Sequence, residues 1–207
     1  MDCIWGARSI CLIILLMLEL LSNRWPDNSD NDLCWFAMSA PFRRELDAQK
    51  LLDEMSIESF IPMAYKVIMR KGKKKREWCP VVSNLIFVHA TRKCIQEVKT
   101  YRIPFLQYLT KSDEGRNLPL VVPNNQMEQF MRASQIKNEK IVYLTAHELD
   151  RLGTGVRVRI LGGPFDGIEG VFQRVQGCRS KRVVVVLQGI LAIVLSEICL
   201  DLLEVLE

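Results

Sequence analysis

Histidine is scarce in this sequence, and its cysteines are far apart. The two histidines, His89 and His147, do not form an HxxxH pattern. Neither has a neighbouring pattern of Cys, Ser or carboxylate residues that would suggest a catalytic triad. The seven cysteines are at least 8 positions apart, so the chain has no CxxC pair and no zinc-ribbon spacing. We therefore expect no metal site and no cofactor. An odd number of dispersed cysteines is typical of a reducing compartment, here the cytoplasm.

Motifs that bind phosphate or calcium are also missing. Residues 162–167 have the glycine spacing of a P-loop, but Ile168 and Glu169 stand where Lys and Ser or Thr would contact phosphate and Mg²⁺. The acidic stretch 27–32 lacks the glycine and the terminal Glu of a calcium loop. The sequence thus names no catalytic residue, and we expect a protein that is not an enzyme.

The overall composition is that of a globular protein. The 207 residues are 49% hydrophobic and 25% charged, which excludes wholesale disorder, a collagen-like fibre and a multi-span membrane protein. This length suits one large domain or two small ones. The 28 Lys and Arg against 24 Asp and Glu give a net charge of +4, which permits a nucleic-acid partner without requiring one.

Residues 1–33 differ from the rest and form an N-terminal extension. Their apolar run, residues 10–21, is interrupted by Glu19 and is shorter than the ~20 residues of a bilayer span. A signal peptide is one explanation, since Arg8 precedes the run, but no small-residue cleavage site follows it. The explanation we prefer is an extra amphipathic helix or a start codon assigned too far upstream.

The first folded unit is expected over residues 34–138. Residues 34–38 predict a buried strand, and Pro41 suits the first turn of a following helix. Further on, residues 81–88 and 105–109 predict strands, and Thr91 is a candidate helix cap. The order of elements, β-α-β-β-α-β-α, predicts an α+β unit, an antiparallel sheet with helices packed on it. The apolar faces expected for the three helices are Ala48, Leu51, Leu52 and Met55; Ile95 and Val98; and Met127, Phe130 and Met131.

A dense cluster of positive charge lies inside this unit. Residues 66–77 contain seven basic residues and one acidic residue. Because like charges repel, the cluster suits the exposed tip of a hairpin that follows the strand-like residues 57–69. Two interpretations remain open: a tip that only improves solubility, or phosphate contact by Lys71, Lys73, Lys74 and Lys75.

The second unit is expected over residues 153–207, after a linker at 139–152. Val156, Val158 and Ile160 alternate with arginines, as in a half-buried strand, and residues 183–187 predict another. Between them lies a glycine-rich turn, residues 162–170. Several short strands in about 55 residues suit a small β-barrel. The tail from Ile190 onward fits a helix as well as a strand.

Residues 158–171 (VRILGGPFDGIEGV) resemble a KOW motif, whose turn would comprise Gly163, Pro164, Phe165, Gly167 and Gly170. Together with Trp35-Phe36, the KGKKKRE loop, residues 80–88 and Val122-Pro123, the chain resembles the NusG family of transcription factors over residues 34–207. It is most similar to the specialised RfaH and UpxY paralogues. The resemblance implies an α+β fold: an NGN-type antiparallel sheet with packed helices, followed by a small SH3-like KOW β-barrel.

The resemblance also implies partners and contact residues. RNA polymerase would offer its clamp helices to an apolar depression lined by Val82, Leu85 and Phe87 on a strand and Met127 on a helix. The chain departs from the family at Leu85, where an aromatic residue is common, and at Ser83, where a proline is common. The opposite face would contact the non-template DNA strand or nascent RNA. The residues implied for that contact are Arg43, Arg44 and Arg102.

Three functions follow from these features. The preferred one is an antitermination factor that binds polymerase as a monomer and suppresses pausing or termination at specific operons. The second is a general NusG-type elongation factor, in which the KOW domain recruits Rho or the ribosome. The third is a KOW-type RNA or ribosome binder without polymerase contact. We further predict that the second unit rests as a barrel that leaves Leu85 unmasked, because the glycine-rich turn would break a helical hairpin.

Overall fold

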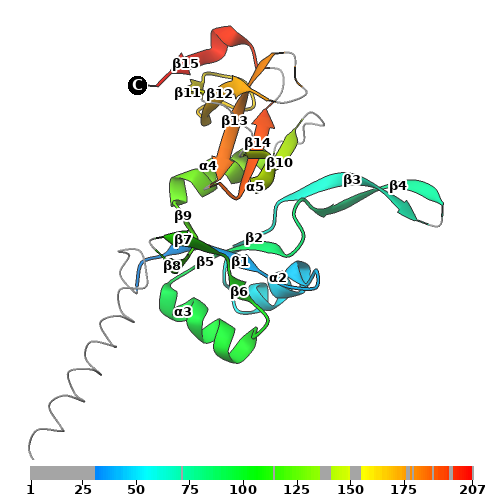
Figure 1. The fold of residues 1–207 in the computed structure, drawn as a ribbon, viewed down its shortest axis with the longest axis vertical. Helices are drawn as coiled ribbons and strands as arrows, with labels where there is room; N and C mark the ends of the chain where they lie inside the picture. Colours follow the sequence, from blue (N-terminus) through cyan, green and yellow to red (C-terminus); the bar gives the residue numbers. More distant parts are fainter. Residues whose placement is uncertain are drawn as a thin grey trace, which may run out of the picture.

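The computed structural model describes most of the chain beyond the N-terminal extension. The residues described are 31–70, 72–113, 115–135, 141–149, 155–175, 178, 180–187, 189–195 and 198–206. Lys71, most of residues 1–33 and both ends of the expected linker lie outside them. Two units are stacked along the long axis, with helix α4 (Asn124–Gln135) between them (Figure 1).

The first unit is built on a five-stranded antiparallel sheet. β1 (Cys34–Ser39) lies at its centre and pairs along its whole length with β5 (Leu85–Ala90). Side chains alternate across these two strands, so Trp35, Ala37, Leu85 and Phe87 face one side and Phe36, Met38, Ile86 and Val88 the other. The strands that complete the sheet are β2 (Ser59–Phe60), β6 (Gln107–Tyr108) and β9 (Val121–Val122).

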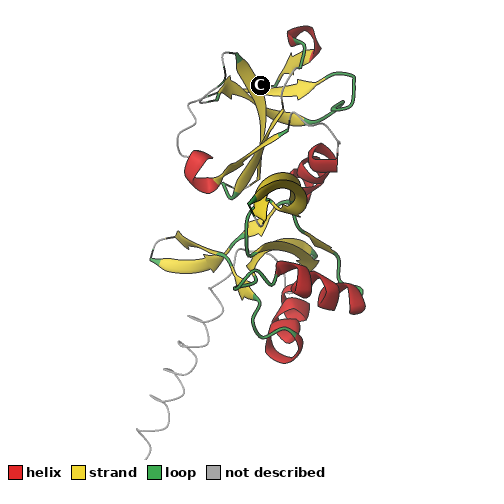
Figure 2. Cartoon of the chain, turned by 90° about the vertical axis from the view of Figure 1, so that its right-hand side faces the viewer, coloured by secondary structure: helices red, strands yellow, loops and turns green. Residues whose placement is uncertain are grey.

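Two helices cover the Phe36 side of this sheet, as Figure 2 shows from the side. α2 (Glu45–Glu54) buries Ala48 and Leu52 there. α3 (Arg92–Glu97) is capped by Thr91, whose hydroxyl accepts a hydrogen bond from the Cys94 N–H at 3.2 Å. It continues as a π-helical turn, Val98–Arg102, and both Ile95 and Val98 are buried. The expected cap and inward faces are confirmed.

Two hairpins extend from the first unit. β3 (Met63–Arg70) and β4 (Lys73–Pro80) pair along their full length and project away from the body of the molecule (Figure 1). β7 (Thr110–Asp113) and β8 (Arg116–Pro119) form a shorter ribbon. The predicted hairpin with a basic tip is therefore confirmed.

The second unit is a six-stranded antiparallel sheet, called here the C-terminal sheet. Its strand order is β10-β14-β13-β12-β11-β15. The tail that fitted a helix as well as a strand forms β14 and β15 with a short 3₁₀ turn, Leu200–Leu202, between them. A short helix, α5 (Ala146–Leu149), follows the first strand. The strands are β10 (Val142–Thr145), β11 (Val156–Ile160), β12 (Glu169–Arg174), β13 (Lys181–Leu187), β14 (Leu191–Leu195) and β15 (Leu203–Val205).

Three boundaries differ from the sequence-based prediction. Pro41 lies in a turn rather than in the first turn of α2, which begins only at Glu45. Residues 81–84 form a bend and turn before β5, because Asn84 adopts a left-handed conformation with φ of 68° that interrupts an extended strand. Residues 142–145, predicted as linker, pair with β14 as the edge strand β10. The second unit therefore begins at β10.

Candidate functional site

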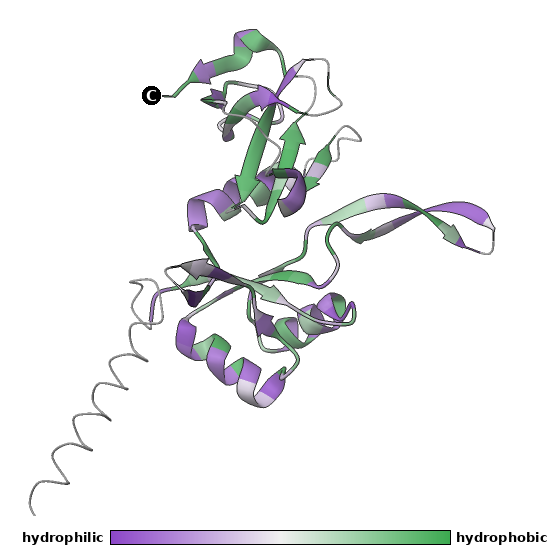
Figure 3. Cartoon of the chain, in the orientation of Figure 1, coloured by the Kyte–Doolittle hydropathy of each residue, from purple (hydrophilic) through white to green (hydrophobic). Residues whose placement is uncertain are grey.

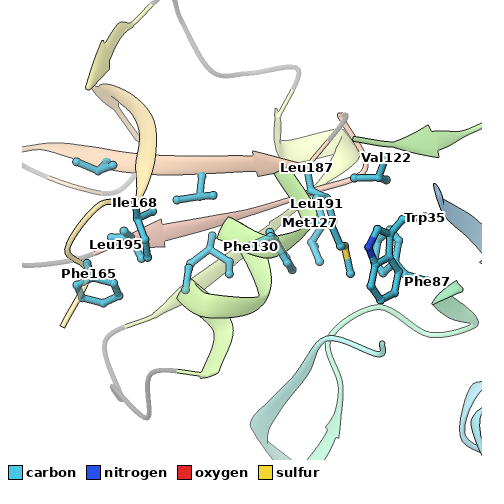
Figure 4. Packing of buried hydrophobic residues seen from close by; sticks show 14 of the residues in the cluster. Trp35, Phe87, Val122, Met127, Phe130, Phe165, Ile168, Leu187, Leu191 and Leu195 are labelled. Atoms are coloured by element: carbon cyan, nitrogen blue, oxygen red, sulfur yellow. The ribbon is translucent and has the colours of Figure 1, made fainter. Parts of the chain in front are cut away.

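An apolar junction joins the two units through α4. Met127, Phe130 and Ala133 on this helix are fully buried and belong to one continuous hydrophobic cluster with both sheets. On one side the cluster contains Trp35, Ala37, Leu85 and Phe87 of the first sheet. On the other side it contains residues of the C-terminal sheet, among them Leu187, Leu191 and Leu195. Figure 4 shows Met127 and Phe130 lying between these two sets.

Phe130 illustrates how the helix contacts both units at once. Its ring lies edge-on to Phe60 of β2, with centroids 6.4 Å apart, and 6.5 Å from the ring of Tyr143 on β10. Burial raises the pKa of Tyr143, which keeps its hydroxyl neutral. In Figure 3 the facing strands β13 and β14 are coloured as strongly hydrophobic.

Two hydrogen bonds lie at the rim of this junction. The Arg132 guanidinium donates to the carbonyl of Asp166 at 2.7 Å, and the Glu169 N–H donates to the Gln129 side-chain oxygen at 2.9 Å. Asp166 and Glu169 both belong to the glycine-rich turn. The turn is therefore held against the C-terminal half of α4, and its own Phe165 and Ile168 are buried in the same cluster.

The glycine-rich turn has the backbone that its sequence suggests. Gly163 and Gly167 have φ of 72° and 74°, a region open to glycine but strained for other residues. Pro164 is exposed, whereas Phe165 points inward. Gly170 lies in β12, where an added Cβ would come 2.7 Å from a Val183 methyl group and 2.9 Å from the Val184 carbonyl oxygen. The two left-handed glycines shape the turn, and the buried Phe165 anchors it. Gly170 instead permits β12 and β13 to pack closely.

The residues implied for polymerase docking gather at the junction and are covered there. Leu85 is only 3% exposed, and Phe87 and Met127 are fully buried. Val82 is half-buried and packs at the edge of the cluster, in the bend before β5 rather than on the strand. Leu85 is therefore buried rather than exposed, within a cluster that includes α4 and residues of both sheets. Sequence periodicity does not reveal that α4 presents apolar side chains to two sheets rather than one.

The arginines implied for nucleic-acid contact lie together on the other part of the first unit. Arg43 and Arg44 are exposed at the start of α2, and the Arg44 guanidinium lies 3.6 Å above the centroid of the Phe105 ring. Phe105 comes three positions after Arg102, which is also exposed and ends the π-helical turn. This contact brings the two arginine-bearing segments side by side.

The turn that presents Arg43 is strained. Phe42 and Arg43 have φ of 62° and 58°, left-handed values that cost roughly 1–2 kcal/mol per non-glycine residue. The Arg43 N–H donates to the Asn84 side-chain oxygen at 2.7 Å, and the Ala40 N–H donates to the Asn84 carbonyl, also at 2.7 Å. Asn84 thus holds the turn in place. The turn displays Phe42 with 91% of its surface exposed, a feature that the sequence analysis missed.

The basic tip is exposed, and Glu77 forms ion pairs with two of its basic side chains. Lys73, Lys74 and Lys75 all face solvent, and Lys75 lies 3.2 Å from a carboxylate oxygen of Glu77. Arg70 reaches the other oxygen of Glu77 at 3.2 Å. Lys71 lies outside the described residues. Because the hairpin projects from the body, its tip and the Arg43–Arg44 region are two separate basic areas (Figure 1).

The described residues show neither a metal site nor a membrane-spanning helix. No group of three His, Cys, Asp or Glu side chains in that part of the chain is arranged to hold a metal ion. None of the helices within it is both long enough and apolar enough to cross a membrane. His89 has a structural environment: its ring stacks on Trp35 at 4.7 Å and bonds to Glu58 at 2.8 Å.

Comparison with known proteins identifies the first unit. Residues 33–131 match the family model described as transcription termination factor NusG. The first unit is similar to the NusG family over these residues, and we call it the NusG domain. The NusG domain includes the sheet, both hairpins and the first two turns of α4, so the Leu85, Phe87 and Met127 cluster and all three arginines lie within it. The NusG family is one of transcription factors rather than enzymes.

The chain is also weakly similar to a solved structure of a NusG protein. The structure described as "Domain interaction in Thermotoga maritima NusG" is similar, with a TM-score of 0.40 and 17% sequence identity. The alignment covers 86% of this chain and 100% of that chain. No curated protein sequence matches this chain at a significant level.

Proposed function

We propose that this protein is a transcription regulator that binds RNA polymerase through its NusG domain and suppresses pausing or termination at specific operons. Support comes from the match over residues 33–131 and from the apolar surface of Leu85, Phe87 and Met127, with Val82 at its edge. Such a surface suits a partner helix laid in a groove, here the polymerase clamp helices. Leu85 and Ser83, which depart from the common family residues, favour the specialised paralogue over the general factor.

The observation that carries the proposal is the coverage of this surface. Leu85, Phe87 and Met127 are buried in a cluster that also holds residues of the C-terminal sheet, which contacts α4, and we infer that polymerase binding requires the two units to separate. The described rim holds only two hydrogen bonds between α4 and the glycine-rich turn, each worth about 1 kcal/mol. We propose that the sheet is a KOW-type barrel, and that polymerase competes with it for α4. Once released, the barrel becomes available to Rho or the ribosome.

Nucleic-acid contact forms the second part of the proposal. Arg43, Arg44 and Arg102 would contact the non-template DNA strand, since guanidinium groups both bind phosphate and stack on bases. The exposed ring of Phe42, held out by its strained turn, adds a further stacking surface. The basic hairpin tip would add phosphate contacts to DNA or nascent RNA.

The competition is tested by weakening the rim. A Gln129→Ala, Arg132→Ala variant removes both hydrogen bonds without touching the cluster, and we expect it to bind polymerase up to roughly thirtyfold more tightly. Glu128→Ala, an exposed change on the same helix, is the matched control. Affinity for purified core polymerase in high salt is the measurement. Equal or weaker binding by the double variant, with an unchanged thermal transition, would contradict competition.

Polymerase binding, ribosome co-purification and mapped transcript ends together separate the alternative functions. A KOW-type RNA or ribosome binder would co-purify with ribosomes and would not bind polymerase in either form. A general elongation factor would bind polymerase and act at most genes, whereas the proposed factor would change transcript length only downstream of particular leader sequences. Transcript ends mapped with and without the protein distinguish these two cases.

A further inference from the structure

The β3–β4 hairpin has two chemically different faces. The register pairs Tyr65 with Trp78, Val67 with Arg76 and Met69 with Lys74. Because side chains alternate along a strand, these pairs all lie on one face. Their apolar members are exposed, between 55% for Trp78 and 66% for Val67. We call this set, Tyr65, Val67, Met69, Trp78, Arg76 and Lys74, the aromatic face.

The opposite face carries most of the hairpin's internal polar contacts. There, Glu77 pairs with both Arg70 and Lys75 at 3.2 Å. Lys66 on the same face donates to the carbonyls of Pro80 and Val81 at 2.8 and 2.7 Å. The exposed apolar residues on the aromatic face have no second layer over them among the described residues, because the hairpin is a two-stranded ribbon.

The aromatic face is already ordered around its rings. Tyr65 and Trp78 meet edge to face with centroids 4.8 Å apart, and the Arg76 guanidinium lies 4.5 Å from the centroid of the Tyr65 ring. Such contacts fix planar groups in place while their outer surfaces stay open to solvent. A prearranged stack of this kind loses little side-chain entropy when another planar group is added.

Charge identifies the kind of partner. Residues 63–80 contain seven Lys or Arg and one Glu, a net charge of +6, whereas the whole chain carries +4. The rest of the chain is therefore net negative, at −2. Positive charge is concentrated on a hairpin that projects from the molecule, which favours an anionic partner. Aromatic and guanidinium planes beside it favour a partner with flat, exposed rings.

We propose that the aromatic face binds an unpaired nucleic-acid strand, with a base stacked on Trp78 and phosphates beside Lys74 and Arg76. Paired bases hide their faces inside the duplex, so aromatic side chains add affinity only for single strands. Each strand of the hairpin has eight residues and spans about 26 Å, enough to contact several nucleotides. The inference rests on the proposed nucleic-acid contact but is independent of polymerase binding.

The test measures binding of the full chain to fluorescein-labelled oligothymidine and oligouridine of about 15 nucleotides, and to a DNA duplex of the same length. A Tyr65→Ala, Trp78→Ala variant is expected to bind the single strands roughly tenfold or more weakly. Its duplex affinity and its salt dependence should stay unchanged, because the lysines and arginines remain. Trp78→Phe, which keeps a ring, should retain most of the affinity.

Ile68→Ala on the opposite face is the matched control, and co-purification with core polymerase is measured in parallel. Unchanged single-strand binding by the Tyr65→Ala, Trp78→Ala variant would overturn the proposal and leave the hairpin a purely electrostatic contact. Loss of polymerase binding with unchanged single-strand binding would instead make the aromatic face a protein-docking surface, which also overturns it. A failure of polymerase binding by the parent protein alone would refute the proposed function and leave this inference standing.

Discussion

At the scale of single residues, several side chains have roles set by their immediate neighbours. Gly170 is required by space rather than by backbone conformation, since Val183 and the Val184 carbonyl occupy the position of a Cβ. Gly72, in contrast, has a φ of 75° with nothing within 4 Å of an added Cβ. Two glycines of one chain are thus required for different physical reasons.

Gly170→Ala is expected to lower the free energy of unfolding by about 1–3 kcal/mol, because overpacking forces β12 and β13 apart. Gly72→Asn is the control, since asparagine tolerates a left-handed conformation and the site is open. Urea unfolding of both variants measures the difference. Equal stability of the parent and the Gly170→Ala variant would mean that the strands shift without cost.

Leu85→Asp provides a second residue-scale prediction. Leu85 is 3% exposed within the apolar junction, so the substitution would bury an unpaired carboxylate at a cost of several kcal/mol. We expect a large loss of thermal stability, and not merely weaker polymerase binding in a folded protein. Differential scanning calorimetry measures it. Val82→Asp, at the half-buried edge, should be milder, and the reverse order of the two would contradict the burial shown here.

At the scale of elements, α4 packs against both units, whereas the β3–β4 hairpin packs against neither sheet. α4 is amphipathic toward two sheets, contacting β1 on one side and β13 and β14 on the other. The hairpin pairs only with itself and carries its charge far from the core. Changes in α4 are therefore expected to affect the packing of both units, whereas changes at the hairpin tip are expected to leave the fold intact.

We expect that changing Lys73, Lys74 and Lys75 together to Ser alters the free energy of unfolding by no more than about 0.5 kcal/mol, because all three side chains face solvent. Nucleic-acid affinity should fall, and the slope of log affinity against log salt should decrease by about one unit for each lost phosphate contact. Fluorescence anisotropy over a salt series gives the slope. A slope identical to that of the parent would show that the tip only improves solubility.

At the scale of the whole molecule, the two units share one hydrophobic cluster. The cluster runs from Trp35 through Met127 to Leu195, so neither unit alone covers all of its apolar surface. A covered surface of this kind prevents non-specific association and reserves it for a partner that competes successfully. In the proposed function, the closed arrangement is a resting state from which polymerase would select the open one.

A fragment of residues 31–135 should accordingly expose Met127 and its neighbours. We expect it to bind the apolar dye ANS more strongly than the full chain does, and to bind polymerase more tightly. Circular dichroism checks that the fragment keeps its fold. Equal ANS fluorescence in the fragment and the full chain would indicate that α4 collapses onto the first sheet by itself.

The sequence alone determined much of this protein. A short apolar and aromatic run predicted β1, and alternation predicted β11. The 3.6-residue period predicted the buried faces of α2 and α4, and the run of lysines marked the hairpin tip, because each signal is local. The resemblance carried by Trp35-Phe36 and residues 80–88 agreed with the family match. Local patterns failed where a single residue redirected the backbone, as at Asn84 and in the Pro41 turn.

Only the tertiary structure decided how the candidate site is used. The sequence marks Leu85, Phe87 and Met127 as apolar but does not show that they share one cluster with β13 and β14, since these strands follow Met127 by more than fifty positions. It likewise does not show that Val142–Thr145 joins the second sheet, because an edge strand is recognised by its partner and not by its own side chains. Long-range packing of apolar surface therefore decides whether the proposed docking surface is open or closed.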